Sequence, residues 1–153
     1  MDTLKIGGLF HDIGKIGVPD AILQKNGKLD DDEYSQIKQH PNIGVHILSH
    51  AKIFQNILPI VEHHHERYDG KGYPDGLIGE KIPLEAQLVS VADVYDALVS
   101  ERIYKDAIEK EKAYHMILMG ECGVFSPKLM ECFRESKDCL LYTSPSPRDM
   151  RRS

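Results

Sequence analysis

Apolar residues in this chain repeat at helical spacing, and no stretch alternates between apolar and polar residues as a half-buried strand would. Leu84, Leu88, Val91, Tyr95 and Leu98 recur three or four residues apart, which places their side chains on one face of an α-helix. A chain of 153 residues is long enough to bury one sizeable core. We therefore predict an all-α fold built as a single helical bundle.

Capping and breaking residues indicate where the helices begin and end. Asp30 followed by Glu33 is the pattern of a capping box, and the helix that starts there is expected to stop at His40, because Pro41 disfavours helical geometry in the residue before it. The other predicted helices are a buried segment of residues 4–10, one that opens with Pro41, one that carries Ile53, Ile57, Ile60 and Val61, one that opens with Pro83, one over residues 106–119, and a short one that opens with Ser126–Pro127.

Two segments have a different composition. Residues 68–83 (YDGKGYPDGLIGEKIP) are dense in glycine, proline and aspartate, which favours successive turns; the two tyrosines favour an ordered loop with a function. The chain ends in LLYTSPSPRDMRRS, which has Ser-Pro steps, arginines and no periodicity. We predict one domain over residues 1–138 and a disordered tail over residues 139–153, which resembles a translated sequencing adapter and is interpreted as a non-native artefact.

The charge and the cysteines restrict the partners. A net charge of −5 argues against binding to a nucleic-acid polymer or an anionic membrane, but it allows a small phosphorylated ligand held by local cations. No apolar run approaches the roughly 20 residues of a membrane-spanning helix, and the N-terminus lacks the pattern of a secretory signal. The three cysteines form no C-x-x-C pair, as is typical of reduced thiols, so a cytoplasmic location is expected.

Residues that suit a metal site stand at the edges of separate predicted helices. Imidazole and carboxylate together favour iron, manganese or zinc, and two such ions can polarise a phosphoryl group and activate the water that attacks it. Asp93 lies one position off the apolar stripe of its helix, so its side chain can face the bundle interior. The candidates are His11, Asp12, Lys15, His40, residues 63–65 (three histidines) and Asp93.

Each candidate also has an ordinary explanation. The His11–Asp12 pair alone is more often a capped helix end, and three consecutive histidines are nearly as often a solvated run. His40 can be a cation that complements a helix dipole, and Asp93 can be a surface acid. The metal interpretation depends on their joint placement. His46 and His50 lie four residues apart but have no further support, so they are interpreted as surface residues.

Taken in order, several motifs resemble the HD-GYP family, the metal-dependent phosphodiesterases of the HD superfamily that hydrolyse cyclic di-GMP in bacteria. The resemblance covers about residues 4–135 and includes the namesake residues Gly72–Tyr73–Pro74. A closing GECGVFSPKL segment also matches. The five motifs are HDIGKIGVPD, KQHPNIG, HHERYDGKGYPDGL, VADVYDAL and SERIYKDA.

The resemblance implies an HD-superfamily helical bundle with a long ordered GYP loop and a site for two or three divalent ions, iron or manganese. His11 and Asp12 would be ligands of adjacent metals, with Asp12 as the bridge. Asp93 would complete the first metal's ligands, and His63 would lie outside the shell. The second metal would be held by His40, His64 and His65.

The resemblance also implies residues that meet the substrate. Lys15 would be a cation beside the scissile phosphate, and with Asp12 it is the catalytic candidate. Tyr73 would pack against guanine or the site wall. Arg102 and Lys105 would hold phosphates of the substrate, although on their own they are explained equally well as a solvated basic pair.

One departure from the family pattern is notable. The family carries a further histidine ligand on a helix before the HD pair, and residues 1–10 contain no histidine. We therefore expect an N-terminally truncated domain, weakened in metal binding, that is fused to a sensor or receiver domain in the full-length protein. The truncated chain itself is expected to be weakly active or inactive.

The leading hypothesis for the function is hydrolysis of cyclic di-GMP to pGpG or GMP by a metal-bridged hydroxide. The alternatives are a noncatalytic module that senses cyclic di-GMP or docks onto a protein, and an HD phosphohydrolase that acts on another nucleotide.

Overall fold

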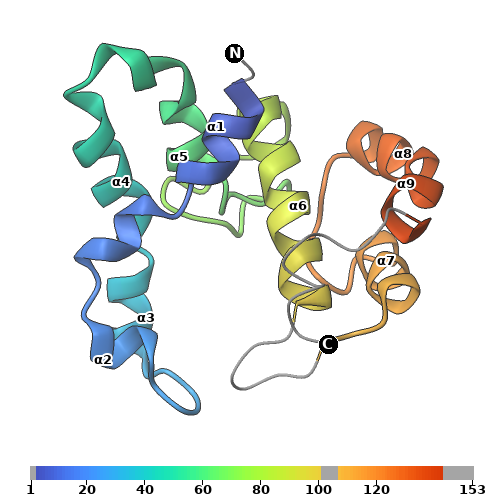
Figure 1. The fold of residues 1–153 in the computed structure, drawn as a ribbon, viewed down its shortest axis with the longest axis horizontal. Helices are drawn as coiled ribbons and strands as arrows, with labels where there is room; N and C mark the ends of the chain where they lie inside the picture. Colours follow the sequence, from blue (N-terminus) through green and yellow to red (C-terminus); the bar gives the residue numbers. More distant parts are fainter. Residues whose placement is uncertain (1–2, 101–106, 143–153) are drawn as a thin grey trace.

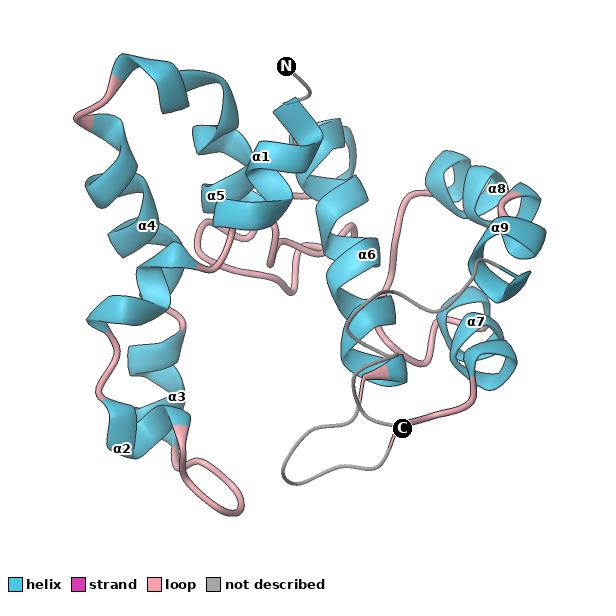
Figure 2. Cartoon of the chain, in the orientation of Figure 1, coloured by secondary structure: helices cyan, strands magenta, loops and turns pink. Residues whose placement is uncertain are grey.

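The computed structural model describes residues 3–100 and 107–142, and within these ranges the protein is helical (Figures 1 and 2). The described residues form no strand; a single isolated bridge pairs Asp69 with Ile78. No helix in this part of the chain is long and apolar enough to cross a membrane. In order, the elements are α1 (Thr3–Phe10), η1 (Ile13–Gly17), α2 (Asp20–Leu23), α3 (Asp31–Ile37), α4 (His40–Ser49), η2 (Lys52–Ile57), α5 (Leu58–His63), η3 (Gly79–Lys81), α6 (Leu84–Val99), α7 (Lys110–Leu118), α8 (Pro127–Glu135) and α9 (Lys137–Tyr142).

The first half of the chain packs around a small core formed by α1, α4, η2 and α5. Leu48, Ile57 and Val61 are buried there, and Phe10 of α1 packs against them. Helix α4 lies against η1 and α5, and α5 in turn contacts α6. The ends of several helices are thereby brought together at the junction of α1, η1, α4 and α5.

Helix α6 occupies the middle of the molecule and joins the first half to the second (Figure 1). Its residues Val91 and Leu98 are buried in a second core with residues of α7 and α8, among them Tyr114, Ile117 and Phe133. These positions follow the apolar spacing that predicts the helix. The predicted all-α fold is confirmed.

Several predicted helix ends are confirmed by their caps. The Asp30 side chain accepts a hydrogen bond from the backbone of Glu33 while the Glu33 side chain accepts one from Asp30, as a capping box requires. Ser126 caps α8 in the same way through its hydroxyl. Pro83 directly precedes α6.

Other boundaries differ from the prediction. Helix α3 already ends at Ile37, and His40 is the first residue of α4, not the last of α3. The single helix predicted through residues 53–61 is wrong, because it is split into the 3₁₀ segment η2 and the helix α5, with Pro59 in the first turn of α5. A proline lacks the N–H group that a continuous helix would need there.

The helix at the start of the chain is less buried than predicted. Leu9 is 80% exposed and Leu4 is 36% exposed, although their spacing favours a buried segment. The face of α1 that is covered carries Gly7, where a Cβ would lie 2.4 Å from the Ile60 side chain. A glycine here permits α1 to approach α5 closely. The buried face of α1 is therefore not the face predicted from its large apolar residues.

The predicted helix over residues 106–119 is shorter in the structure, since α7 begins at Lys110. Near the C-terminus, helix α9 extends through Tyr142, four residues into the predicted tail, and Leu140 and Leu141 pack against the second core. The remainder of that tail lies outside the described residues, so the tail stays a prediction.

The predicted loop over residues 68–83 is ordered and turns back on itself. The Gly79 N–H donates to the Tyr68 carbonyl, beside the Asp69–Ile78 bridge. Gly70 and Gly76 both have positive φ, which a glycine adopts without strain. The loop therefore returns to α5, close to the three consecutive histidines.

Candidate metal centre

Six polar side chains meet where α1, η1, α4, α5 and α6 converge. His11 and Asp12 occupy the turn between α1 and η1, and His40 opens α4. His64 caps the C-terminus of α5 and is followed by His65. Asp93 comes from the middle of α6. All of the residues predicted as metal ligands are thus brought together by helix termini and one helix interior.

The first group is formed by Asp12, His40, His64 and His65, whose ligand atoms all lie within 4.8 Å of one another. The His40 and His64 Nε2 atoms are 3.3 Å apart, and Asp12 Oδ1 is 3.3 Å from the former and 3.8 Å from the latter. Both of these imidazoles are fully buried.

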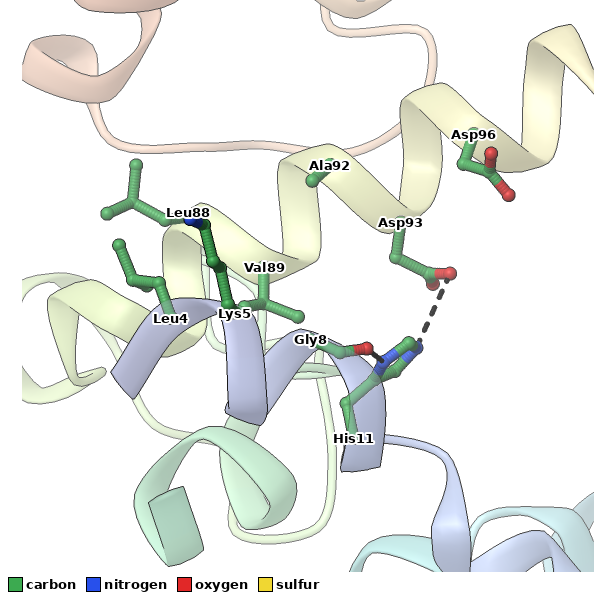
Figure 3. A pocket seen from close by; sticks show the side chains of 9 residues that line it. All are labelled: Leu4, Lys5, Gly8, His11, Leu88, Val89, Ala92, Asp93 and Asp96. Carbon is green, nitrogen blue, oxygen red and sulfur yellow. Dashed lines mark hydrogen bonds and ion pairs between the residues drawn. The ribbon is translucent and has the colours of Figure 1, made fainter. Parts of the chain in front are cut away.

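The second group is formed by His11, Asp12 and Asp93. His11 Nε2 is 3.3 Å from Asp12 Oδ2 and 3.7 Å from Asp93 Oδ1, as Figure 3 shows for the His11–Asp93 pair. Asp12 therefore belongs to both groups and turns a different oxygen to each. The two groups of possible ligands therefore meet at one carboxylate.

Backbone carbonyls fix the orientation of three imidazole rings. His11 Nδ1 lies 2.7 Å from the Gly8 carbonyl oxygen, His40 Nδ1 lies 2.7 Å from that of Ile37, and His64 Nδ1 lies 2.9 Å from that of Val61. A carbonyl oxygen only accepts, so each Nδ1 donates and carries the proton. The three Nε2 atoms, which point toward the cluster, are then left to accept in the neutral rings, as in histidines that bind metals.

Some of the possible ligand atoms have no hydrogen-bond partner in the cluster. His11 Nε2 and Asp12 Oδ1 are buried atoms with no hydrogen-bond partner among the described residues, and the Nε2 atoms of His40 and His64 face each other at 3.3 Å. Unsatisfied buried acceptors are costly, and a cation placed among them removes that cost. Imidazole and carboxylate suit a divalent transition metal, so the residues present fit a metal.

The protonation of the groups agrees with that fit. Burial, followed by the charges of His11 and His40, lowers the pKa of His64 to about 4. Burial and the neighbouring imidazoles lower the pKa of His65 to about 2. Both rings are therefore neutral near pH 7, the state in which histidine binds a metal.

The acidic side of the site is also prepared for a cation. Burial opposes the charged form of Asp12, but His11, His40 and Lys15 outweigh burial and hold its pKa well below the usual range. The ion pair with His11 likewise lowers the pKa of Asp93. Burial would lower the pKa of His11, yet the two carboxylates raise it to about 10, so a positive charge is favoured between Asp12 and Asp93.

The predicted substrate residues are placed in part. Lys15 Nζ donates to Asp12 Oδ2 at 2.6 Å, so its charge lies at the centre of the site. The Tyr73 ring stacks on His65 with centroids 4.8 Å apart, which makes it part of the site wall. Arg102 and Lys105 lie outside the described residues. His63 is in neither group of ligands and lies between Glu62 and Asp75.

A groove between α1 and α6 leads to the second group of ligands. It encloses about 620 Å³ and has a mostly apolar lining, with His11 and Asp93 at one end (Figure 3). Its walls are formed by Leu4, Lys5, Gly8, His11, Leu88, Val89, Ala92, Asp93 and Asp96. His11 and Asp93 are therefore accessible from this groove.

Two further residues support the site, and one of them, Glu66, was not singled out from the sequence. Gly14 packs so closely on α4 that a Cβ would lie 1.8 Å from the His40 carbonyl oxygen. Glu66 is 3% exposed and accepts hydrogen bonds from three backbone N–H groups of the GYP loop. An acid directly after the histidine pair was the available signal for the latter.

Comparison with known proteins gives a consistent result. Residues 1–122 match the HD domain family. The chain is 45% identical over 130 residues to the cyclic di-GMP phosphodiesterase response regulator RpfG of Xanthomonas campestris. It is 46% identical over 126 residues to a cyclic di-GMP phosphodiesterase of Thermotoga maritima, and 39% identical over 139 residues to the 3'3'-cGAMP-specific phosphodiesterase 2 of Vibrio cholerae.

These alignments cover most of this chain but a minor part of each relative. They include 81 to 90% of the chain and 27 to 34% of the relatives' lengths. Among solved structures, a HDG"Y"P protein from Bdellovibrio bacteriovorus matches with a TM-score of 0.66 and 25% identity, over 87% of this chain and 42% of that protein. The chain thus spans about a third of the length of the curated relatives it matches.

Proposed function

Because the chain belongs to the HD-GYP group of the HD domain family, we propose that it is the catalytic domain of a metal-dependent phosphodiesterase that hydrolyses cyclic di-GMP. The observation that carries the proposal is the position of Asp12. Its two oxygens face two separate groups of imidazole and carboxylate side chains, which supports a site for two adjacent ions.

We assign the ligands by the oxygen of Asp12 that they face. One ion would be held on the Oδ1 side by His40, His64 and His65, and the other on the Oδ2 side by His11 and Asp93. Nitrogen and oxygen ligands in this mixture suit iron or manganese. When bound, such a pair of ions polarises the phosphoryl group and lowers the pKa of the attacking water.

The protein's own residues hold and orient the reacting groups. The carbonyls of Gly8, Ile37 and Val61 keep the imidazoles in the ligating tautomer. Lys15, already 2.6 Å from Asp12 Oδ2, is placed to stabilise negative charge on a phosphoryl oxygen bound at the same centre. Tyr73 closes the wall beside His65. We retain Arg102 and Lys105 as candidates for the substrate's outer phosphates, and pGpG or GMP as the products.

A second substrate has specific support. A relative named for 3'3'-cGAMP is 39% identical to this chain, close to the 45% of a relative named for cyclic di-GMP. Both cyclic dinucleotides present the same phosphodiester to the ligands, so the difference must lie in contacts to the bases.

The name of a response regulator among the relatives also supports fusion to a receiver or sensor domain in the full protein.

The experiment is hydrolysis of each cyclic dinucleotide by the manganese- or iron-loaded chain. Wild-type chain is expected to release linear product slowly, because residues 1–10 lack the family's further histidine ligand, but faster from cyclic di-GMP than from 3'3'-cGAMP, and Asp12→Asn is expected to reduce turnover to background. His50→Ala, which changes an exposed histidine outside both groups, is the matched control. Preference for 3'3'-cGAMP would reassign the substrate, and binding without hydrolysis would favour a sensing module.

A further inference from the structure

The GYP loop is attached to the rest of the protein by the carboxylate of Glu66. One of its oxygens accepts from the backbone N–H groups of Asp75 at 2.7 Å and Gly76 at 3.1 Å, and the other accepts from Leu77 at 3.0 Å. Glu66 is 3% exposed, and a buried carboxylate is costly unless such donors surround it. Hydrogen bonds to an ionised acceptor are also stronger than neutral ones.

The same loop is held from its other side by close backbone packing at Gly72. A Cβ at this position would lie 2.4 Å from the Glu66 Cα and 2.3 Å from the Arg67 backbone nitrogen, so no other residue fits without a shift. Between these two attachments stands Tyr73, whose N–H donates to the His65 carbonyl at 3.2 Å. The position of Tyr73 is therefore fixed by residues 65–67.

His65 differs from the other imidazoles of the site in what orients its ring. His11, His40 and His64 each donate Nδ1–H to a backbone carbonyl, whereas no such bond is made by the His65 ring to any of the described residues. Its ring instead stacks on Tyr73, with an interplanar angle of 24° and centroids 4.8 Å apart. Tyr73 also meets the His40 ring edge-on.

From these contacts we infer that Glu66 is a positioning residue, which fixes the GYP loop so that Tyr73 can hold His65 in the orientation of a metal ligand. The Glu66 carboxylate bonds to the loop backbone and not to a ligand side chain, and its effect passes through the loop backbone and the Tyr73 ring. Only one part of the inference rests on the proposed function, namely that the orientation of His65 serves to bind a metal. The mechanical link from Glu66 through Tyr73 to His65 depends on the protein's own contacts.

The test begins with Glu66→Gln, which keeps the shape of the side chain and removes its charge. The amide nitrogen of glutamine cannot accept a hydrogen bond. It would therefore face a backbone N–H group of the loop where a carboxylate oxygen now accepts. Hydrogen exchange of the loop amides at residues 75–77 is expected to accelerate, and manganese affinity is expected to fall by about tenfold, as for other residues that orient metal ligands. Glu131→Gln, which changes an exposed acid of α8 outside every group of possible metal ligands, is the control and should change neither quantity.

Variants of Tyr73 keep the inference testable if Glu66→Gln fails to fold. Tyr73→Phe preserves the stacked ring and should retain the wild-type manganese affinity, whereas Tyr73→Ala should lose affinity as Glu66→Gln does. Because both substitutions act through the same contacts, their effects should not add. The double variant Glu66→Gln/Tyr73→Ala should therefore bind manganese as tightly as Tyr73→Ala alone. Equal manganese affinity in Tyr73→Ala and wild type would overturn the inference.

A readout without metal separates this inference from the proposed function. In the metal-free chain, the ring signals of His65 in nuclear magnetic resonance spectra should broaden or shift in Glu66→Gln and Tyr73→Ala, but not in Glu131→Gln. Unchanged His65 signals and unchanged loop exchange would refute the positioning role even if the chain is an active phosphodiesterase. Failure of the wild-type chain to bind manganese would refute the proposed function while these signals still decide the role of Glu66.

Discussion

Gly14 offers the sharpest test of how the site is assembled, because its close contact involves backbone and cannot relax through a side chain. A Cβ at residue 14 would lie 1.8 Å from the His40 carbonyl oxygen and 2.6 Å from the Gly44 nitrogen, where real Cβ atoms keep at least 3.0 Å. Gly14→Ala must therefore move the start of α4 away from η1 by about 1.2 Å. That shift moves His40 away from Asp12 and His64.

The expected cost follows from the nature of this contact. Overpacking in a core typically costs about 1–3 kcal/mol of unfolding free energy. Because the atoms that a Cβ at residue 14 would meet belong to the backbone, we expect Gly14→Ala to cost about 3 kcal/mol, which corresponds to a melting temperature lower by roughly 10 °C. A misplacement of about 1 Å at a catalytic site can cost about 100-fold in rate. Turnover should therefore fall by more than the loss of folded protein alone would explain.

Thermal unfolding followed by circular dichroism, with manganese titration of the folded variant, measures both effects of Gly14→Ala. The control is Gly8→Ala, since a Cβ at residue 8 meets nothing within 4 Å and alanine is favoured in a helix by up to about 1 kcal/mol. Gly8→Ala should keep or raise the melting temperature. A Gly14→Ala variant with wild-type stability and manganese affinity would refute the claim that this contact sets the position of His40.

Three further predictions concern protonation, charge and the loop. Between pH 7 and pH 5 the free energy of unfolding of the metal-free chain should fall by on the order of 3 kcal/mol, because His64 and His65 stay neutral in the folded protein down to about pH 4 and about pH 2 while both become protonated in the unfolded chain. His11 offsets a minor part of this fall, since its raised pKa keeps it charged in the folded protein whereas the unfolded chain is only partly protonated there at pH 7. Urea unfolding at pH 7 and pH 5 measures this, and an equal fall in His64→Gln would contradict it. Lys15→Met should lower kcat while manganese affinity is kept or raised, since Lys15 competes with the ion for Asp12 Oδ2; weaker manganese binding in a titration would count against the assignment. Arg67→Ala should destabilise the chain by about 2 kcal/mol in urea unfolding, because Arg67 donates to Ser90 Oγ and lies over the Phe125 ring; a change within about 0.5 kcal/mol would show that this link is not needed.

The sequence predicts those features that depend on local chemistry. The capping box of Asp30 and Glu33 and the cap at Ser126 are formed by residues three apart, and both are present. The candidate ligands were recognised because each is a polar side chain at the edge of an apolar helix, and the structure brings them into two groups that share Asp12. Their roles in binding metal and substrate stay predictions.

The features that were missed depend on contacts between distant segments. Gly7 and Gly14 set how closely α1 and η1 approach their neighbours, and helical spacing contains no information about that distance. Leu9 is exposed because the covered face of α1 is the one with the glycine. The hydrogen bonds of Glu66 cross nine to eleven residues of loop, so no periodicity reveals them.

The central claim, that Asp12 joins two adjacent metal sites, is tested most directly by electron paramagnetic resonance of the manganese-loaded chain together with elemental analysis. We expect two manganese ions per chain and a signal from magnetically coupled ions, with the coupling lost in Asp12→Asn. A single ion per chain, or two ions whose signals are uncoupled in the wild-type chain, would contradict it.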